Sequence, residues 1–187
     1  EDEARRVGAF SLYLGLIISA LFAVGIAVFM EPVLRLLGAG ENTFQYARQY
    51  ATCVIVIGGI PTVLSNVLAN LIRSIGRSRE ASTGIILGGL LNIALDPLFM
   101  FVLMPDGYEV LGAGLATCLS NCVAFLFFVV VLVRMGRGSV ITFSLKGGMP
   151  KGESIGAIFG VGVPSAITTF LFDMDYVILD KLMVGHG

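Results

Sequence analysis

The sequence is poor in charge, which limits the classes of protein that it can form. Charged residues make up 13% of the 187 residues and the formal net charge is -1, whereas hydrophobic residues make up 56%. No basic run is present, so we expect no nucleic-acid partner. A water-soluble domain could not cover this much apolar side-chain surface with polar groups. The composition therefore predicts a protein whose solvent is lipid.

Residues that carry hydrolytic or metal chemistry are also scarce. The single histidine, His186, stands at the end of the chain, and no serine–histidine or metal-ligating pair accompanies it. The three cysteines, Cys53, Cys118 and Cys122, lie inside apolar stretches and cannot all pair with one another. We interpret them as small packing residues, and we expect no enzyme, no cofactor and no structural metal site.

The apolar residues fall into five long blocks, each of roughly the length that a helix needs to cross a bilayer. The blocks run from about Val7 to Met30, Ala51 to Ile72, Ala81 to Met104, Val110 to Val133, and Ile155 onward to at least Phe172. A stretch GAGENTFQYARQY, expected to lie at the membrane interface, separates the first two. The sequence thus predicts an all-α membrane protein, a polytopic bundle of about five transmembrane helices.

The basic residues are divided unevenly between the connections on the two sides of the membrane. If the N-terminus is cytoplasmic, nine of the twelve lysines and arginines lie inside, and only Arg35, Arg48 and Lys181 lie outside. The positive-inside rule favours this orientation, in the plasma (inner) membrane. The chain starts at Glu1 without a methionine, and its first apolar block is too long for a cleavable signal peptide. We therefore expect a segment of a longer transporter.

The fourth and fifth blocks are joined by the longest polar connection, which is rich in glycine. It predicts a cytoplasmic linker at about 138–153 between an N-terminal lobe segment, residues 1–137, and the first helix of a second lobe, residues 154–187. Prolines interrupt three blocks at Pro61, Pro97 and Pro164. Each removes a backbone donor, so these helices either kink toward a cavity or simply tolerate the proline.

The third block contains the most informative stretch, LLNIALDPLFMF. Asn92 and Asp96 are four residues apart and therefore share a helix face, and Pro97 follows directly. An ionised aspartate at membrane depth is costly unless it is paired, so such residues usually face the bundle interior and serve transport. The alternative is a structural hydrogen bond to a neighbouring helix, or a position near the outer interface.

Other polar side chains form stripes on the neighbouring blocks. Asn66 and Asn70 are four residues apart in the second block, as are Thr117 and Asn121 in the fourth. Asn66, Asn70 and Asn121 are candidates for lining a cavity with Asp96. Their alternative role is to hold helices together through hydrogen bonds.

Three stretches together resemble one family. LSNVLANLIRSIGRSRE, LLNIALDPLFMF and LGAGLATCLSN are similar, in this order and spacing, to successive helices of the multidrug and toxic compound extrusion (MATE) transporters. The resemblance covers essentially the whole chain and places its spans as helices three to seven of twelve. It implies part of a MATE fold, which in its complete form has two six-helix lobes. The partners of this segment would be the bilayer and helices 1–2 and 8–12 of its own polypeptide.

The resemblance also implies a function and a site. An inward flow of H⁺ or Na⁺ would drive the export of small organic cations, with the coupling cation bound by Asn92, Asp96 and Thr117. The family's first helix supplies a further aspartate, and this chain does not contain that helix. In the second lobe, the sequence position of Asp173 is near that of a glutamate that some family members carry in helix seven. The segment around Asp180 resembles the part of the first helix that contains its aspartate. The alternative for Asp173, Asp175 and Asp180 is a solvated helix end.

Two other functions are alternatives to cation-coupled export. A flippase for lipid-linked precursors, of the same superfamily, would need a more cationic cavity, whereas the intramembrane charges here are nearly all acidic. A non-transporting membrane scaffold would leave Asp96 beside Asn92 without a purpose. Export of organic cations by cation-coupled antiport is therefore the function that the sequence favours.

Overall fold

The computed structural model describes residues 2–136 and 149–185, with side chains up to residue 179. Within these ranges every regular element is helical. The elements are α1 (Asp2–Val28), α2 (Met30–Leu36), α3 (Glu41–Ala51), a π-helical turn (Thr52–Ile57), α4 (Gly59–Ser74), α5 (Ser78–Leu98), a second π-helical turn (Phe99–Leu103), α6 (Glu109–Met135) and α7 (Gly152–Gly185).

Four helices are long and apolar enough to cross a membrane, and there are five such spans if the bent pair Glu41–Ile57 and Gly59–Ser74 crosses as one. The expectation of an all-α protein with about five spans is therefore confirmed. The differences lie at the second span, which was expected at 51–72. Its helix already begins at Glu41, so most of the stretch assigned to the membrane interface is helical.

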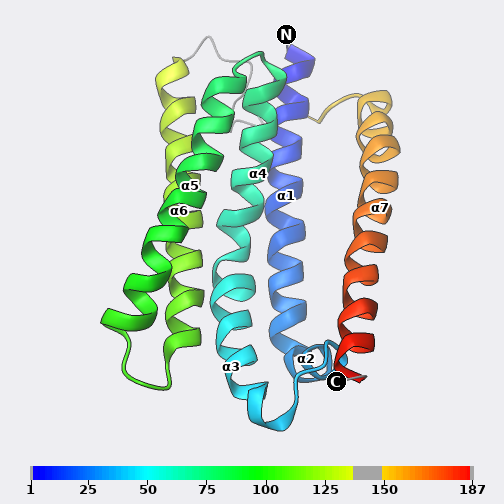
Figure 1. Ribbon diagram of the computed structural model, residues 1–187. Helices are drawn as coiled ribbons and strands as arrows, with labels where there is room; N and C mark the ends of the chain where they lie inside the picture. The colour runs from blue at the N-terminus through cyan, green and yellow to red at the C-terminus, as the bar shows by residue number, and fades with distance from the viewer. Residues whose placement is uncertain (1, 137–148, 186–187) are drawn as a thin grey trace.

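The first four spans form one bundle, as the short connections between them predict. Helix α4 packs against α1, α5 and α6, and α5 packs along α6 (Figure 1). The core lies among these helices at the end of the bundle where the N-terminus is found, and it is made of Leu12, Leu68, Ala69, Ile72, Ala81, Phe128 and Leu132. Burying such side chains against one another fixes which face of each helix turns inward.

Small residues allow α5 and α6 to approach closely. A Cβ atom on Gly84 would collide with the ring of Phe128, and one on Gly88 would lie 3.1 Å from Cβ of Ala124. Close contact through glycine and alanine is the usual way for helices to pack in lipid, because no hydrophobic effect drives them together there. This contact brings the polar residues of α5 and α6 within reach of each other.

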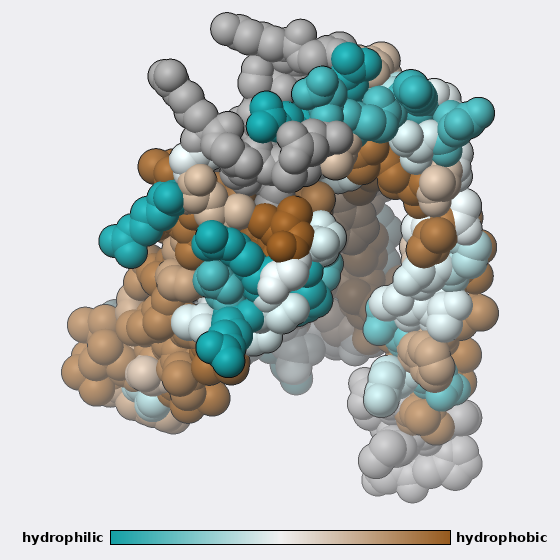
Figure 2. All heavy atoms as spheres, turned by 90° about the horizontal axis from the view of Figure 1, so that it is seen from above, coloured by the Kyte–Doolittle hydropathy of each residue, from teal (hydrophilic) through white to brown (hydrophobic). Residues whose placement is uncertain are grey.

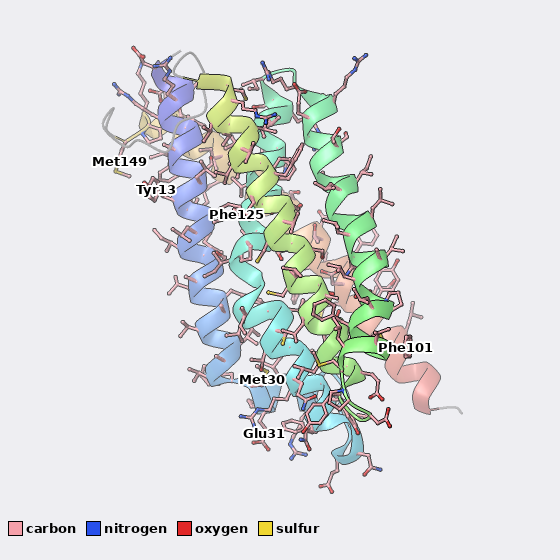
Figure 3. All side chains as sticks on the ribbon, turned by 90° about the vertical axis from the view of Figure 1, so that its left-hand side faces the viewer. Tyr13, Met30, Glu31, Phe101, Phe125 and Met149 are labelled. Atoms are coloured by element: carbon pink, nitrogen blue, oxygen red, sulfur yellow. The ribbon has the colours of Figure 1, made fainter. Side chains whose placement is uncertain are left out.

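The outer surface of the bundle is apolar along its sides and polar at its ends. Figure 2 looks onto the end where the N-terminus lies, and hydrophilic side chains gather there; Arg73, Arg77 and Arg79 are among the exposed residues of this part of the chain. In Figure 3, Phe101 points away from the helices near the opposite end, and 74% of it is exposed. This distribution fits a bundle surrounded by lipid.

Helix α7 stands beside the bundle and runs in the same direction as α1 (Figure 1). No residue of α7 with a described side chain is buried. Glu3 of α1 ties the start of α7 to the bundle, since its Oε1 accepts hydrogen bonds from the Lys151 backbone N–H at 2.7 Å and from Ser154 Oγ at 2.8 Å. Of the expected linker, residues 138–148 lie outside the described residues, as does His186.

Candidate functional site

The structure brings Asn92, Asp96 and Thr117 together between α5 and α6. The side-chain amide Nδ2 of Asn92 donates to Asp96 Oδ1 at 3.1 Å and to Thr117 Oγ1 at 3.2 Å. All three residues are half-buried. We refer to them as the Asp96 cluster.

The local sequence explains this geometry. Asn92 and Asp96 lie one helical turn apart, so their side chains meet on one face of α5. Pro97 follows, and the α-helical pattern gives way to the π-helical turn Phe99–Leu103 two residues later. π-Helical turns within helices are frequent at functional sites. Asp96 lies about 8 Å along the helix from the middle of the span Ser78–Leu103, toward the loop that joins α5 to α6.

The polar groups of the cluster are of the kind that bind hard cations. They are a carboxylate, an amide and a hydroxyl, and oxygen ligands of this kind suit hard cations rather than thiophilic transition metals. Among the described residues no group of three or more His, Cys, Asp or Glu side chains could hold a metal ion. One carboxylate balances one positive charge, which fits H⁺ or Na⁺ better than a divalent ion.

A second polar group lies between α4 and α6. Asn121 Nδ2 donates to Thr62 Oγ1 at 2.8 Å, and Thr62 Oγ1 donates to the backbone oxygen of Gly58 at 2.7 Å. Ser65 Oγ donates to the Pro61 backbone oxygen at 2.7 Å. A cavity of about 100 Å³ adjoins this group, and its lining includes Thr62, Ser65, Asn66, Gly88 and Asn121.

Sequence reasoning identified Asn121 but missed Thr62. A threonine in an apolar helix usually bonds only to its own helix, so its type gives no signal. The available signal was its position, four residues after Gly58 and directly after Pro61. A hydroxyl there can reach a backbone oxygen near a break in the helix.

The two asparagines of the second span lie outside the Asp96 cluster. Asn66 and Asn70 are both exposed. Asn66 Nδ2 donates to the Thr62 backbone oxygen at 2.9 Å, and Asn70 Oδ1 accepts from Arg73 Nη1 at 2.8 Å. Asn66 lines the small cavity, whereas the bond of Asn70 turns it toward the arginine end of α4, away from the Asp96 cluster.

The acidic residues of α7 are not brought to the Asp96 cluster. Asp173 and Asp175 are exposed, and the side chain of Asp180 lies outside the described residues. Cys53, Cys118 and Cys122 are free, with Cys53 buried and the other two half-buried.

Comparison with known proteins gives a consistent set of relatives. The MatE family model matches residues 1–98. The multidrug export protein MepA of Staphylococcus saprophyticus is 31% identical over 187 residues, which is 99% of this chain and 40% of that protein. MepA of Staphylococcus aureus strain NCTC 8325 is 26% identical over all of this chain and again 40% of its own length. The chain thus spans about two fifths of the curated relatives that it matches.

Solved structures agree with this result. An inward-facing multidrug resistance MATE transporter of the MOP superfamily is 32% identical, with a TM-score of 0.78 over 88% of this chain and 36% of its own. An outward-facing MATE transporter has a TM-score of 0.81 at 29% identity, over 91% of this chain and 37% of its own. A MOP superfamily transporter from Pyrococcus furiosus, whose reversed pocket polarity suggests a different function, has a TM-score of 0.79 at 30% identity over 90% and 36%.

Proposed function

Because this chain belongs to the MatE family, we propose that it forms part of a cation-coupled antiporter that exports organic cations across the membrane. The observation that carries the proposal is the Asp96 cluster, a carboxylate held by an amide and a hydroxyl between two membrane helices. The names of the MepA relatives, multidrug export proteins, support drug export as the activity.

Asp96 supplies the charge that changes during the cycle. An ionised carboxylate away from water costs several kcal/mol unless a cation neutralises it. Binding of H⁺ or Na⁺ removes this cost, so the occupied site and the empty site favour different conformations of the transporter. A ligand shifts such an equilibrium by its difference in affinity for the two states. An inward cation gradient can then drive drug outward.

Asn92 and Thr117 position the carboxylate and complete the site. The Asn92 amide N–H₂ bridges Asp96 and Thr117 across the contact between α5 and α6. Hydrogen bonds to an ionised group are stronger than those between neutral groups. The bridge would thus stabilise charged Asp96 before the cation arrives. The Thr117 hydroxyl oxygen and, once its amide has turned over, the Asn92 oxygen would then be neutral ligands for Na⁺. Proton coupling needs only the carboxylate, and both coupling ions remain within the proposal.

The proposal includes the arrangement of the whole protein. Residues 1–137 would belong to one lobe, 138–153 to a cytoplasmic linker, and 154–187 to the first helix of the second lobe. The N-terminus of this segment would be cytoplasmic, in the plasma (inner) membrane, in keeping with the positive-inside distribution of Lys and Arg. Asp173 and Asp180 would contribute in the second lobe.

The charge of the transported molecule distinguishes the export of organic cations from the alternative, a lipid flippase. A flippase for lipid-linked precursors carries an anionic headgroup and would need basic groups at membrane depth. The carboxylate of the Asp96 cluster favours cationic cargo instead. No lysine or arginine lies between residues 81 and 133, the part of the chain that contains the cluster.

The test replaces Asp96 by Asn in the complete gene product, expressed in cells that lack their own drug exporters. We expect efflux of a fluorescent organic cation such as ethidium to fall to background, at an unchanged protein level in the membrane. Asp106→Asn is the matched control, because Asp106 is an exposed acidic residue of the loop after the same span. Undiminished drug export by Asp96→Asn would remove the assignment.

A further inference from the structure

The second span is bent where it passes the polar residues of α6. The segments Glu41–Ile57 and Gly59–Ser74 meet at an angle of 47°. Gly58 stands at the bend, and a Cβ atom there would lie 3.0 Å from the backbone oxygens of Cys53 and Val54. A side chain at this position would be in tight contact with these two backbone oxygens. Pro61 follows and cannot donate a backbone hydrogen bond, so the sequence places the bend at this point of the span.

The hydroxyl of Thr62 joins this bend to α6. It donates to the Gly58 backbone oxygen at 2.7 Å and accepts from Asn121 Nδ2 at 2.8 Å. Thr83 of α5 makes the same kind of bond within its own helix, to the Arg79 backbone oxygen, on an exposed face. The bond to Asn121 therefore distinguishes Thr62 from a threonine that merely satisfies its own hydroxyl.

Helix α6 carries the connection to the Asp96 cluster. Thr117 lies four residues before Asn121, one turn along the same face. Its Oγ1 accepts from Asn92 Nδ2, which also donates to Asp96. Anchoring Asn121 against α4 thus sets the rotation of the α6 face that presents Thr117 to the cluster.

We propose that Thr62 and Asn121 are positioning residues that couple the bend at Gly58 to cation binding at the Asp96 cluster. This inference rests on the proposed function. When the Thr62–Asn121 bond is intact, the α6 face holds Thr117 at hydrogen-bonding distance from Asn92, and the site is organised before the cation arrives. When the bend changes, Thr62 moves with α4, Asn121 loses its partner, and the site loosens. The adjoining cavity of about 100 Å³ gives these side chains room to rearrange.

The bond can be removed from either side in the complete gene product reconstituted into liposomes. Thr62→Val keeps the shape of the side chain and deletes the hydroxyl, and Asn121→Leu deletes the amide at similar volume. We expect each to raise the half-saturating concentration of the coupling cation by roughly threefold to tenfold, the range for one lost hydrogen bond. The drug KM and the rate at saturating cation should stay within about twofold of wild type.

Three further variants separate coupling from a general loss of packing. The half-saturating cation concentration of the double variant should be no higher than that of the more impaired single variant, because both changes remove the same bond. Thr62→Ser restores the hydroxyl and should recover the wild-type value. Thr83→Val removes a hydroxyl whose bond lies within α5 and should leave the half-saturating cation concentration unchanged.

Unchanged cation dependence in Thr62→Val and Asn121→Leu would overturn the inference, as would effects that multiply in the double variant. Asp96→Asn is measured in the same assay. If it still transports, the proposed function fails; if it is inactive while Thr62→Val is normal, only the present inference fails.

A measurement that leaves both residues intact covers the case in which the variants do not fold. Spin labels at Asn42→Cys and Ser74→Cys, on exposed positions either side of the bend, are introduced after the three native cysteines are replaced by alanine. The distance between the labels should change between saturating coupling cation and its absence in wild type. An identical distance in both conditions would overturn the inference.

Discussion

Replacing Gly84 by Ala should separate α5 from α6, although alanine is the better helix former. A Cβ atom at this position would meet the Phe128 ring and lie 2.8 Å from Cδ1 of Phe127. Phe128 is 1% exposed, and the only space described beside its ring is the cavity of about 100 Å³ that it lines with Thr62 and Asn121. The two helices must shift apart or the ring must adopt a strained rotamer.

The magnitude follows from two opposing effects. Overpacking of an enclosed site costs about 1–3 kcal/mol, whereas exchanging glycine for alanine inside a helix contributes up to about 1 kcal/mol of stability. Gly89→Ala, five residues further along α5, is the matched control, because nothing lies within 4 Å of its added Cβ. The difference in stability between the two variants therefore isolates the overpacking cost of about 1–3 kcal/mol.

The assay is thermal unfolding of the complete gene product in detergent, followed by a transport measurement. Gly84→Ala should melt below wild type and Gly89→Ala at or above it. Combining Gly84→Ala with Phe128→Leu should recover part of the loss, since the smaller side chain makes room for the methyl group. Equal melting temperatures for the two alanine variants would refute the close packing of α5 on α6, and with it the placement of Asn92 opposite Thr117.

Three other perturbations test separate parts of the structure. Asn92→Ala removes the bridge but keeps the carboxylate, so flux measured at varied pH and sodium should show cation coupling weakened by roughly tenfold or more without the complete loss expected of the aspartate variant; normal coupling would remove Asn92 from the site. Glu3→Gln leaves the Lys151 N–H with a weaker acceptor, and hydrogen exchange at that amide should quicken by about tenfold, which an unchanged rate would contradict. Glu31→Gln breaks an exposed ion pair with Arg35 and should change stability by less than about 0.5 kcal/mol; a larger change in thermal unfolding would show that α2 depends on this pair.

Much of the fold could be predicted because the bilayer imposes a simple pattern on the sequence. Long apolar blocks gave the spans, and the short connections gave the packing of neighbouring helices. The helix of the second span begins before its apolar block because its first three turns, from Glu41, are polar. Hydropathy alone cannot distinguish a polar helix from an irregular interfacial segment. The bend at Gly58 depends on a close backbone approach, which no local pattern reveals.

The candidate site, too, could be predicted only in part from the sequence. Asn92 and Asp96 belong to one helix, so their spacing alone predicts that they meet. The contact with Thr117 came from the resemblance to MATE transporters, because the relative rotation of α5 and α6 is set by side-chain packing. Asn66 and Asn70 show the limit of spacing arguments: the interval of four residues places them on one face but does not tell whether that face is covered. Thr62 was missed for the same reason, since its partner lies on another helix.

The most direct test of the Asp96 cluster is a measurement of cation movement driven by drug. The complete gene product is reconstituted into liposomes, a gradient of an organic cation is imposed, and the opposite flow of H⁺ and of Na⁺ is recorded for wild type and Asp96→Asn. We expect the drug gradient to drive one of these two cations across the membrane in wild type and neither in Asp96→Asn. Cation flow of wild-type size in Asp96→Asn would contradict this expectation.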